Sequence, residues 1–157
     1  MLKCDFGNLH REFERLGAAG TEVVHLDVMD GHFVDNISFG PAFVSAAAAE
    51  AAAQAAQAGV QWGLYQALNV VGTWKASCGA AQTLDLRSDT GFRVTVSCAS
   101  TDYFEGESIA GTPQLIRLYT LTAVACNGSA SSCPDGASIA GPAYVERRQE
   151  VQAVDPR

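Results

Sequence analysis

The residues best suited to chemistry lie in one eight-residue segment that begins at His25. His25 and Asp27 fall in a β-branched run over residues 23–29, which predicts a strand on which side chains two positions apart share a face. An imidazole and a carboxylate side by side suit a divalent ion such as zinc, although a stable site usually needs at least one more protein ligand. Asp30 and His32 are nearby candidates. The alternative is that these side chains only bond to backbone and water.

A helix is expected to precede this strand. Asp5 can cap it, and Gly17 or Gly20 can end it. Its apolar residues recur at spacings of three and four, so that they form one stripe, consisting of Phe6, Leu9, Phe13 and Leu16. Residues 1–44 are therefore predicted to form a helix and a strand, an incomplete β/α fragment.

Three segments carry a resemblance to a known family, namely Leu2–Leu9, Val24–Val34 and Asn36–Pro41. They resemble the opening of ribulose-phosphate 3-epimerases, which are TIM-barrel enzymes. The resemblance implies that His25 and Asp27 bind a divalent metal, that Asp27 also accepts a proton, and that Met29 lies on the substrate side.

This resemblance covers only about the first quarter of the chain. The family takes a second metal-binding histidine and a second catalytic aspartate from later strands, and no matching segment follows residue 44. Position 35 is Asp35 where the family usually has proline. Epimerisation at a carbon next to a carbonyl requires an acid and a base on opposite faces of that carbon, and only one of these two groups has a counterpart here. We therefore predict no enzymatic activity and no tightly bound cofactor, with at most a weakly held zinc, manganese or iron ion at His25 and Asp27.

An alanine-rich stretch separates this fragment from the rest of the chain. Ten of the fourteen residues from Ser45 to Ala58 are alanine, the best helix former, and Ser45 can cap the run. We predict a domain boundary after residue 44 and one long helix over residues 46–69. Gly59 and Gly63 leave room for close packing, and the expected buried stripe contains Val60, Leu64, Ala67 and Val71, extended by Trp62 and Tyr65.

Beyond this helix the pattern changes to a period of two. Residues 92–98 alternate strictly between apolar and polar, as in an antiparallel strand with one solvated face. Residues 114–126 and 144–151 predict two more strands, and residues 84–86 a short first one. The segments 87–91, 105–113 and 127–142 are rich in turn residues. Residues 45–157 thus predict an α+β domain, a long helix on an antiparallel sheet over residues 83–151.

Five cysteines divide unevenly between the two parts. Cys4 lies in the first, and four lie in the second, at Cys78, Cys98, Cys126 and Cys133. An even number in a small, Gly- and Ser-rich domain favours disulfides and an oxidising compartment. Three pairings are possible, and we favour the neighbour pairs 78–98 and 126–133. A metal site is a weak alternative, because no Cys-x-x-Cys spacing occurs and the last histidine is His32.

Four segments of the second part carry a further resemblance, namely residues 52–66, 92–98, 123–127 and 141–148. They resemble the MshP family of MSHA pilus biogenesis proteins, minor-pilin-like components of type IV pilus systems. The resemblance implies a pilin-like, non-catalytic structural domain in the periplasm or the pilus, with other pilin subunits or pilus-assembly proteins as partners.

Charge and hydropathy exclude other partners. The net charge of −7 opposes binding to nucleic acid. The chain as written shows no apolar export signal and no membrane-spanning segment, because alanine contributes too little transfer energy. Three functions stay open: a pilin-like structural subunit, a truncated epimerase relative, and an artificial or accidental fusion with no function as a whole.

Overall fold

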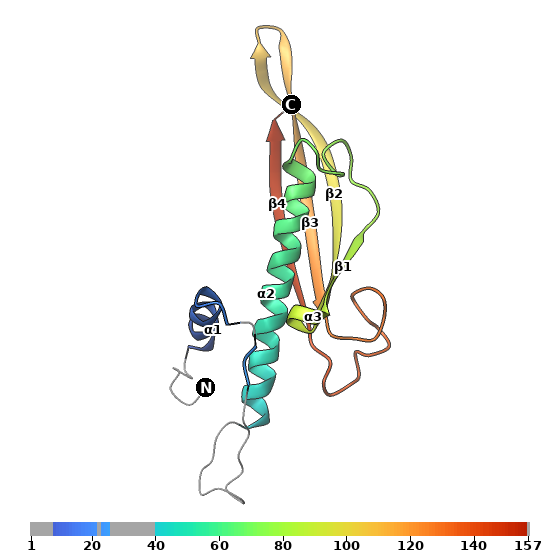
Figure 1. The fold of residues 1–157 in the computed structure, drawn as a ribbon. Coiled ribbons are helices and arrows are strands. Elements are labelled where there is room, and N and C mark those ends of the chain that lie inside the picture. The colour runs from blue at the N-terminus through green and yellow to red at the C-terminus, as the bar shows by residue number, and fades with distance from the viewer. Residues whose placement is uncertain (1–7, 22, 26–39, 157) are drawn as a thin grey trace, which may run out of the picture. The chain divides into compact units, whose positions relative to one another are not determined.

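The computed structural model describes residues 8–21, 23–25 and 40–156. The chain divides into two compact units, Met1–Ala51 (unit 1) and Ala52–Arg157 (unit 2). The division falls inside the long helix α2, which spans Pro41–Leu68 (Figure 1).

In unit 1 the first helix, α1, spans Leu9–Ala18. Asn8 precedes its first residue, whereas Asp5, the predicted cap, lies outside the described residues. Gly20, one of the predicted helix ends, follows α1 at a φ of 78°, which favours glycine. Residues 23–25 of the predicted strand form no strand, and residues 26–29 lie outside the described part.

Helix α2 begins earlier than the sequence predicted. Its first residue is Pro41, and Ser45, the expected cap, is its fifth. Proline is favoured at a first helical position, since its fixed φ suits the helix and no backbone N–H needs a partner there. The helix is therefore 28 residues long and ends at Leu68, one residue before the predicted end.

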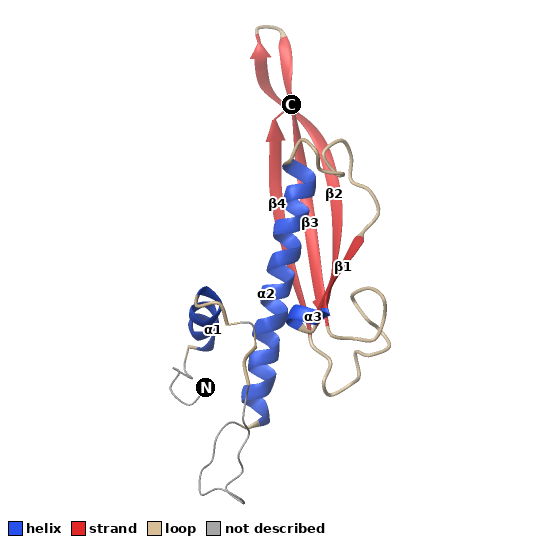
Figure 2. Ribbon diagram, in the orientation of Figure 1, coloured by secondary structure: helices blue, strands red, loops and turns tan. Residues whose placement is uncertain are grey.

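The rest of unit 2 is an antiparallel sheet of four strands in the order β1-β2-β3-β4, so that each strand pairs with its neighbour in sequence (Figure 2). The short helix α3 lies between the first two strands. The elements are β1 (Gln82–Leu86), α3 (Arg87–Thr90), β2 (Phe92–Ile109), β3 (Thr112–Cys126) and β4 (Glu146–Pro156). A long helix on an antiparallel sheet confirms the α+β prediction.

Helix α2 packs on one face of this sheet through two glycines. A Cβ atom at Gly59 would meet Val94 at 2.4 Å and Ala123 at 3.2 Å, and one at Gly63 would meet Val96 at 3.1 Å. Glycine therefore permits the close approach of helix and sheet, as the sequence predicted. Most fully buried residues of the sheet lie on this face, namely Val94, Val96, Tyr119, Leu121, Ala123 and Ala125.

Two expectations about the core need correction. Val71 was predicted to lie in the buried helix stripe, but α2 ends before it and it is 76% exposed. Tyr65, the predicted extension of the stripe, is half exposed. Beside the helix end, Trp74 is buried instead, and its ring meets Trp62 edge to face at 5.2 Å.

Strands β2 and β3 continue past the ends of their neighbours. The pairing of β4 with β3 ends at Ile116, whereas β2 and β3 pair on to Ile109 and Thr112. They form a projecting hairpin (Figure 1) in place of the loop predicted over residues 105–113. The register shifts between Phe104 and Glu107, and Phe104 and Ile109 are each 74% exposed.

Two disulfides join Cys78 to Cys98 and Cys126 to Cys133, so the favoured pairing is confirmed. Cys98 shares the face of Val94 and Val96, toward α2, whereas Cys126 shares the face of Val124, away from it. The two bridges therefore fasten loops to opposite faces of the sheet. They also suggest an oxidising location for the domain.

Candidate functional site

The residues predicted to bind metal are only partly described. His25 is exposed, and it is the last described residue before a gap that contains Asp27, Met29, Asp30 and His32. The proposed ligand pair thus lies partly outside the described residues. One exposed histidine is not a donor set that fits a metal ion. Within the described ranges, no group of three His, Cys, Asp or Glu side chains is arranged to hold one.

Unit 1 instead contains a charged cluster that the sequence analysis missed. His10 on α1 contacts Glu50 on α2 at 2.7 Å through Nδ1 and Glu14 at 3.3 Å through Nε2. The hydrogen bond to Glu50 is the main reason that the pKa of His10 is raised, and the charges of Glu50 and Glu14 add to it. The spacing of four between His10 and Glu14 was a readable signal, but the partner 40 residues away was not.

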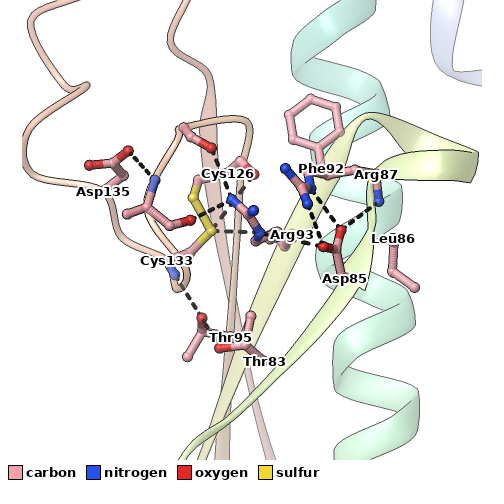
Figure 3. A network of polar contacts seen from close by, with 12 residues as sticks. Thr83, Asp85, Leu86, Arg87, Phe92, Arg93, Thr95, Cys126, Cys133 and Asp135 are labelled. Carbon is pink, nitrogen blue, oxygen red and sulfur yellow. Dashed lines mark hydrogen bonds and ion pairs between the residues drawn. A yellow bond between two sulfur atoms is a disulfide. The ribbon is translucent and has the colours of Figure 1, made fainter.

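A polar network of unit 2 lies on the sheet face opposite α2, beneath the loop of residues 127–145 (Figure 3). Arg93 of β2 is its centre. The guanidinium donates to the carbonyl oxygens of Gly128 and Ala130, and its Nε lies 3.7 Å from Asp85. Asp85 is also bound by Arg87, whose hydrogen bonds lower the pKa of Asp85 to about 2.

The loop is also fastened at its disulfide. The backbone N–H of Cys133 donates to Thr95 Oγ1 at 2.7 Å, and Thr95 Oγ1 lies 3.0 Å from Thr83 Oγ1 (Figure 3). The bridge from Cys133 to Cys126 is thus anchored to β2 and, through Thr83, to β1.

Asp135 organises the interior of the same loop. Its carboxylate accepts hydrogen bonds from the backbone N–H groups of Ala130, Ala137 and Ser138 and from the Ser138 hydroxyl. These bonds, that of Ala130 foremost, lower its pKa to about 2. The side chain is 3% exposed, and a Cβ atom at Gly128 would meet it at 2.3 Å. Asp135 is therefore a structural anion whose oxygens are directed at the protein.

The end of the loop returns to β4 through Tyr144 and Asn127. The Tyr144 hydroxyl accepts from the backbone N–H of Asp135 and donates to Glu146, and burial and this contact raise its pKa. The Asn127 amide bonds to the backbone of Ala143 and Val145 at 2.8 Å each. Both the oxygen and the nitrogen of this amide therefore have a backbone partner.

Two shallow depressions mark the surface of unit 2. One, of about 340 Å³, lies within the loop and is lined mainly by small residues and Tyr144. The other, of about 460 Å³, lies at the end of α2, where Lys75 contacts Asp155 at 2.7 Å. The ion pair holds the segment after α2 to β4. Neither depression brings a nucleophile next to a histidine, since the last histidine of the chain is His32.

Unit 2 is therefore a disulfide-bonded α+β domain whose polar clusters hold its loops in place. Sequence reasoning treated Arg93 as a residue of a solvated strand face and did not single out Asp135. The Cys-Pro-Asp-Gly sequence at 133–136 was the available signal for a folded turn.

Comparison with known proteins concerns the first part of the chain. The ribulose-phosphate 3 epimerase family matches residues 1–61. The ribulose-phosphate 3-epimerase of Rhodobacter capsulatus is 50% identical over 46 residues, 29% of this chain and 20% of that protein. That of Bacillus subtilis is 46% identical over 46 residues, 29% and 21% of the two chains. That of Methanocaldococcus jannaschii is 50% identical over 40 residues, 26% and 17%.

The chain thus spans about a fifth of the length of the curated relatives it matches. The family match reaches beyond residue 44, the predicted boundary, into the alanine-rich part of α2. No solved structure matches the chain. The pilin-like resemblance of the second part stays a prediction.

Proposed function

We propose that this chain acts through unit 2 as a non-catalytic, pilin-like structural or assembly subunit of an MSHA-type pilus system. The observation that carries the proposal is the packing of the 28-residue helix α2 on a four-stranded antiparallel sheet, with a disulfide-closed loop before the last strand. This is the plan expected from the resemblance of residues 52–148.

The polar side chains of unit 2 support a structural role. Arg93, Asp135 and Lys75 each bond to other parts of the same domain. A catalytic acid or base needs a reacting atom within hydrogen-bond reach. Here the oxygens of Asp135 are instead taken up by loop N–H groups and a hydroxyl. The domain is therefore suited to presenting a fixed surface.

The proposed pilus role implies that the domain is located in the periplasm or at the cell surface. Two disulfides persist in an oxidising compartment such as the periplasm or the cell surface. In the part of the chain that the structure describes, no helix is long and apolar enough to cross a membrane. The expected partners are other pilin subunits or pilus-assembly proteins.

Binding to purified pilin subunits of an MSHA-type pilus tests the proposal. The full chain, immobilised on a biosensor, should bind such subunits, and reduction of its disulfides should weaken binding by freeing the 127–142 loop. An unrelated disulfide-bonded domain is the control. Absence of binding by the oxidised, folded chain would contradict the pilus role.

A second candidate, a metal-dependent epimerase relative, is favoured by the match over residues 1–61. We propose that it is inactive, because no residue after 44 matches the second catalytic aspartate or the second metal histidine of the family. The purified chain should not convert ribulose 5-phosphate with added zinc, manganese or iron. Turnover above the blank that disappears in Asp27→Asn would establish the enzyme instead.

The third possibility, an artificial or accidental fusion, gives a different outcome. A fusion without function would fold in unit 2 yet neither bind pilin subunits nor turn over the sugar phosphate. The two assays together therefore separate all three functions.

A further inference from the structure

Strand β4 forms one edge of the sheet of unit 2. It is 11 residues long, and β3 is its only strand neighbour within the described residues (Figure 1). The outer edge of such a strand presents a row of backbone donors and acceptors, which can pair with another strand. An edge of one charge sign would repel a copy of itself, but β4 carries both signs, in Glu146, Arg147, Arg148 and Glu150.

Symmetry restricts how β4 could pair with β4 of a second copy. In a continuous antiparallel sheet the two-fold axis is perpendicular to the sheet, so that each side chain keeps its face. Opposite residues must therefore lie on the same face. Since faces alternate along a strand, the register must be centred on one residue, which then faces its own copy across the axis.

The charged side chains of β4 make some of these registers less favourable than others. Axes at Arg147, Arg148 or Glu150 each place that charged residue opposite its own copy. Directly opposed like charges are destabilising. An axis at Gln149 creates no like-charge pair and brings Arg148 opposite Glu150 twice, once on each side of the axis.

Side-chain exposure supports the Gln149 register. Arg148 and Glu150 lie on the sheet face away from α2, with side chains 65% and 47% exposed, and already contact each other at 3.2 Å within one chain. The register centred on Val151 would instead pair Arg147 with Asp155, whose carboxylate is largely buried and bound to Lys75. The Arg148 and Glu150 side chains, which pair in the Gln149 register, are therefore more accessible to a second copy than Asp155, which would pair in the Val151 register.

Helix α2 leaves room for such a pairing. Gly59 packs over Val94 of β2 and Ala123 of β3, so at this level the helix lies above the two middle strands, and the long Gln149 side chain of β4 reaches it by donating to the Ala53 carbonyl at 3.4 Å. Across the proposed axis, the two helices would be four strand spacings apart, about 19 Å. A helix with its side chains is about 10 Å wide, so the unit 2 parts of the two α2 helices, residues 52–68, fit on the same face without collision.

We propose that β4 pairs antiparallel with β4 of a second copy of this chain, in the register centred on Gln149, to form a continuous eight-stranded sheet. Two symmetric Arg148–Glu150 pairs fix the register, and Arg147 lies opposite Val151 on the other face. This interface goes beyond the proposed function and does not depend on it.

Sedimentation velocity of the full, oxidised chain over a range of concentrations tests the interface. The wild-type chain should form a dimer as concentration rises. Arg148→Glu places four carboxylates around the axis and should weaken dimerisation at least tenfold, and Glu150→Arg should do the same with four guanidinium groups. The double variant Arg148→Glu/Glu150→Arg should restore the wild-type affinity.

Arg147→Glu is the matched control, because it changes the net charge as Arg148→Glu does but lies opposite Val151. It should leave dimerisation within about twofold of the wild type. A wild-type chain that stays monomeric, or a dimer weakened by Arg147→Glu and not by Arg148→Glu, would overturn the proposal. Circular dichroism of each variant confirms that unit 2 is folded, so that a loss of dimer reports on the edge alone.

Discussion

Unit 1 is characterised mainly by its sequence similarity to known enzymes, whereas unit 2 is characterised mainly by its described structure. Unit 1 shares a specific sequence signature with a large enzyme family, yet its described structure is one short helix and the first part of α2. Unit 2 lies largely outside that match, yet it has a buried core, a four-stranded sheet and two disulfides. The family signature and the described, packed core therefore lie largely in different parts of this chain.

The physical reason lies in how many neighbours each element needs. A strand of a TIM barrel is buried on both faces and paired on both edges, within a fold of about 250 residues. The residues that match these enzymes cover about a fifth of the enzymes' length. In unit 2, by contrast, every strand has a partner next to it in sequence, and α2 covers one face.

The largest expected effect comes from filling the contact between α2 and the sheet. Gly59→Leu should destabilise unit 2 by about 3 kcal/mol, because its side chain would collide with the buried Val94 and Ala123. Both tryptophans of the chain, Trp62 and Trp74, lie in unit 2, so urea unfolding followed by their fluorescence reports on that unit.

Gly17→Ala on α1 is the matched control in unit 1. A Cβ atom there meets nothing within 4 Å, so the change should leave the unfolding of unit 2 unaltered and favour α1 by about 1 kcal/mol or less. If Gly59→Leu unfolds at the same urea concentration as the wild type, α2 is not the packed spine of unit 2.

Removal of the disulfides is expected to have the next largest effect. Replacing Cys78 and Cys98 by alanine should cost unit 2 about 3 kcal/mol, and replacing Cys126 and Cys133 about 2.5 kcal/mol, because the second pair closes a shorter loop. The measurement is urea unfolding of each double variant.

Thiol titration gives an independent check. Denatured but unreduced chain should contain one thiol, that of Cys4 in unit 1, and reduced chain five. Five thiols before reduction, with circular dichroism of the folded chain unchanged, would contradict both the pairing and the oxidising location.

Acid should loosen the loop of unit 2 through Asp135. Because its folded pKa is lowered to about 2 from the ordinary 3.8, its contribution to stability is present above about pH 4 and is lost as the pH falls toward 2. The amide resonances of Ala130 and Ala137 should shift over that range. In Asp135→Asn these amide resonances should not shift between about pH 4 and pH 2. If they still shift, a group other than Asp135 causes the acid response.

The smallest expected effect is the opposite pH response of unit 1. The pKa of His10 is raised in the folded chain. Its contribution to the stability of the folded state is therefore fully present below the ordinary pKa of 6.5 and is lost as the pH rises through the raised, folded pKa. Nuclear magnetic resonance should show the pKa of His10 falling more in Glu50→Gln than in Glu14→Gln. Equal shifts in the two variants would mean that the contact between α1 and α2 is not formed in solution.

The sequence predicted the fold of unit 2 where one pattern dominated. The alanine-rich run predicted α2, Gly59 and Gly63 predicted its close packing, and the strict alternation of residues 92–98 predicted β2. The hairpin was missed because residues 105–111 contain two glycines and several polar residues, which are typical of a loop, whereas the structure shows strand pairing with shifted register. Tertiary pairing outweighed local propensity there.

The buried face of β3 illustrates a second limit. Both of its faces carry apolar residues. The alternation therefore groups residues on one face without deciding which face meets α2, and that group is Ile116, Leu118, Thr120, Thr122 and Val124. The structure buries the other set, which includes Leu121 and Ala123. The choice depends on the glycines of α2, which lie about 60 residues earlier.

The candidate site was least predictable from sequence. The neighbour pairing of the cysteines was favoured among three possible pairings, but the role of Arg93 depends on carbonyl oxygens more than 30 residues away and was not predicted. Asp27 and Met29, the residues implied by family resemblance, lie outside the described part. Local patterns thus identified elements and bridges, and not the contacts between distant loops.

The two disulfides, which fasten loops to opposite faces of the sheet, also limit how far unit 2 would extend under a pulling force. A chain stretched from its two ends lengthens only by the segments that can straighten, at about 3.4 Å per residue. The bridges, with sequence separations of 20 and 7, withhold about 70 Å and about 24 Å of that length. Under tension, unit 2 would therefore extend less than the same chain without disulfides, because covalent bonds on both faces of its sheet keep two segments closed.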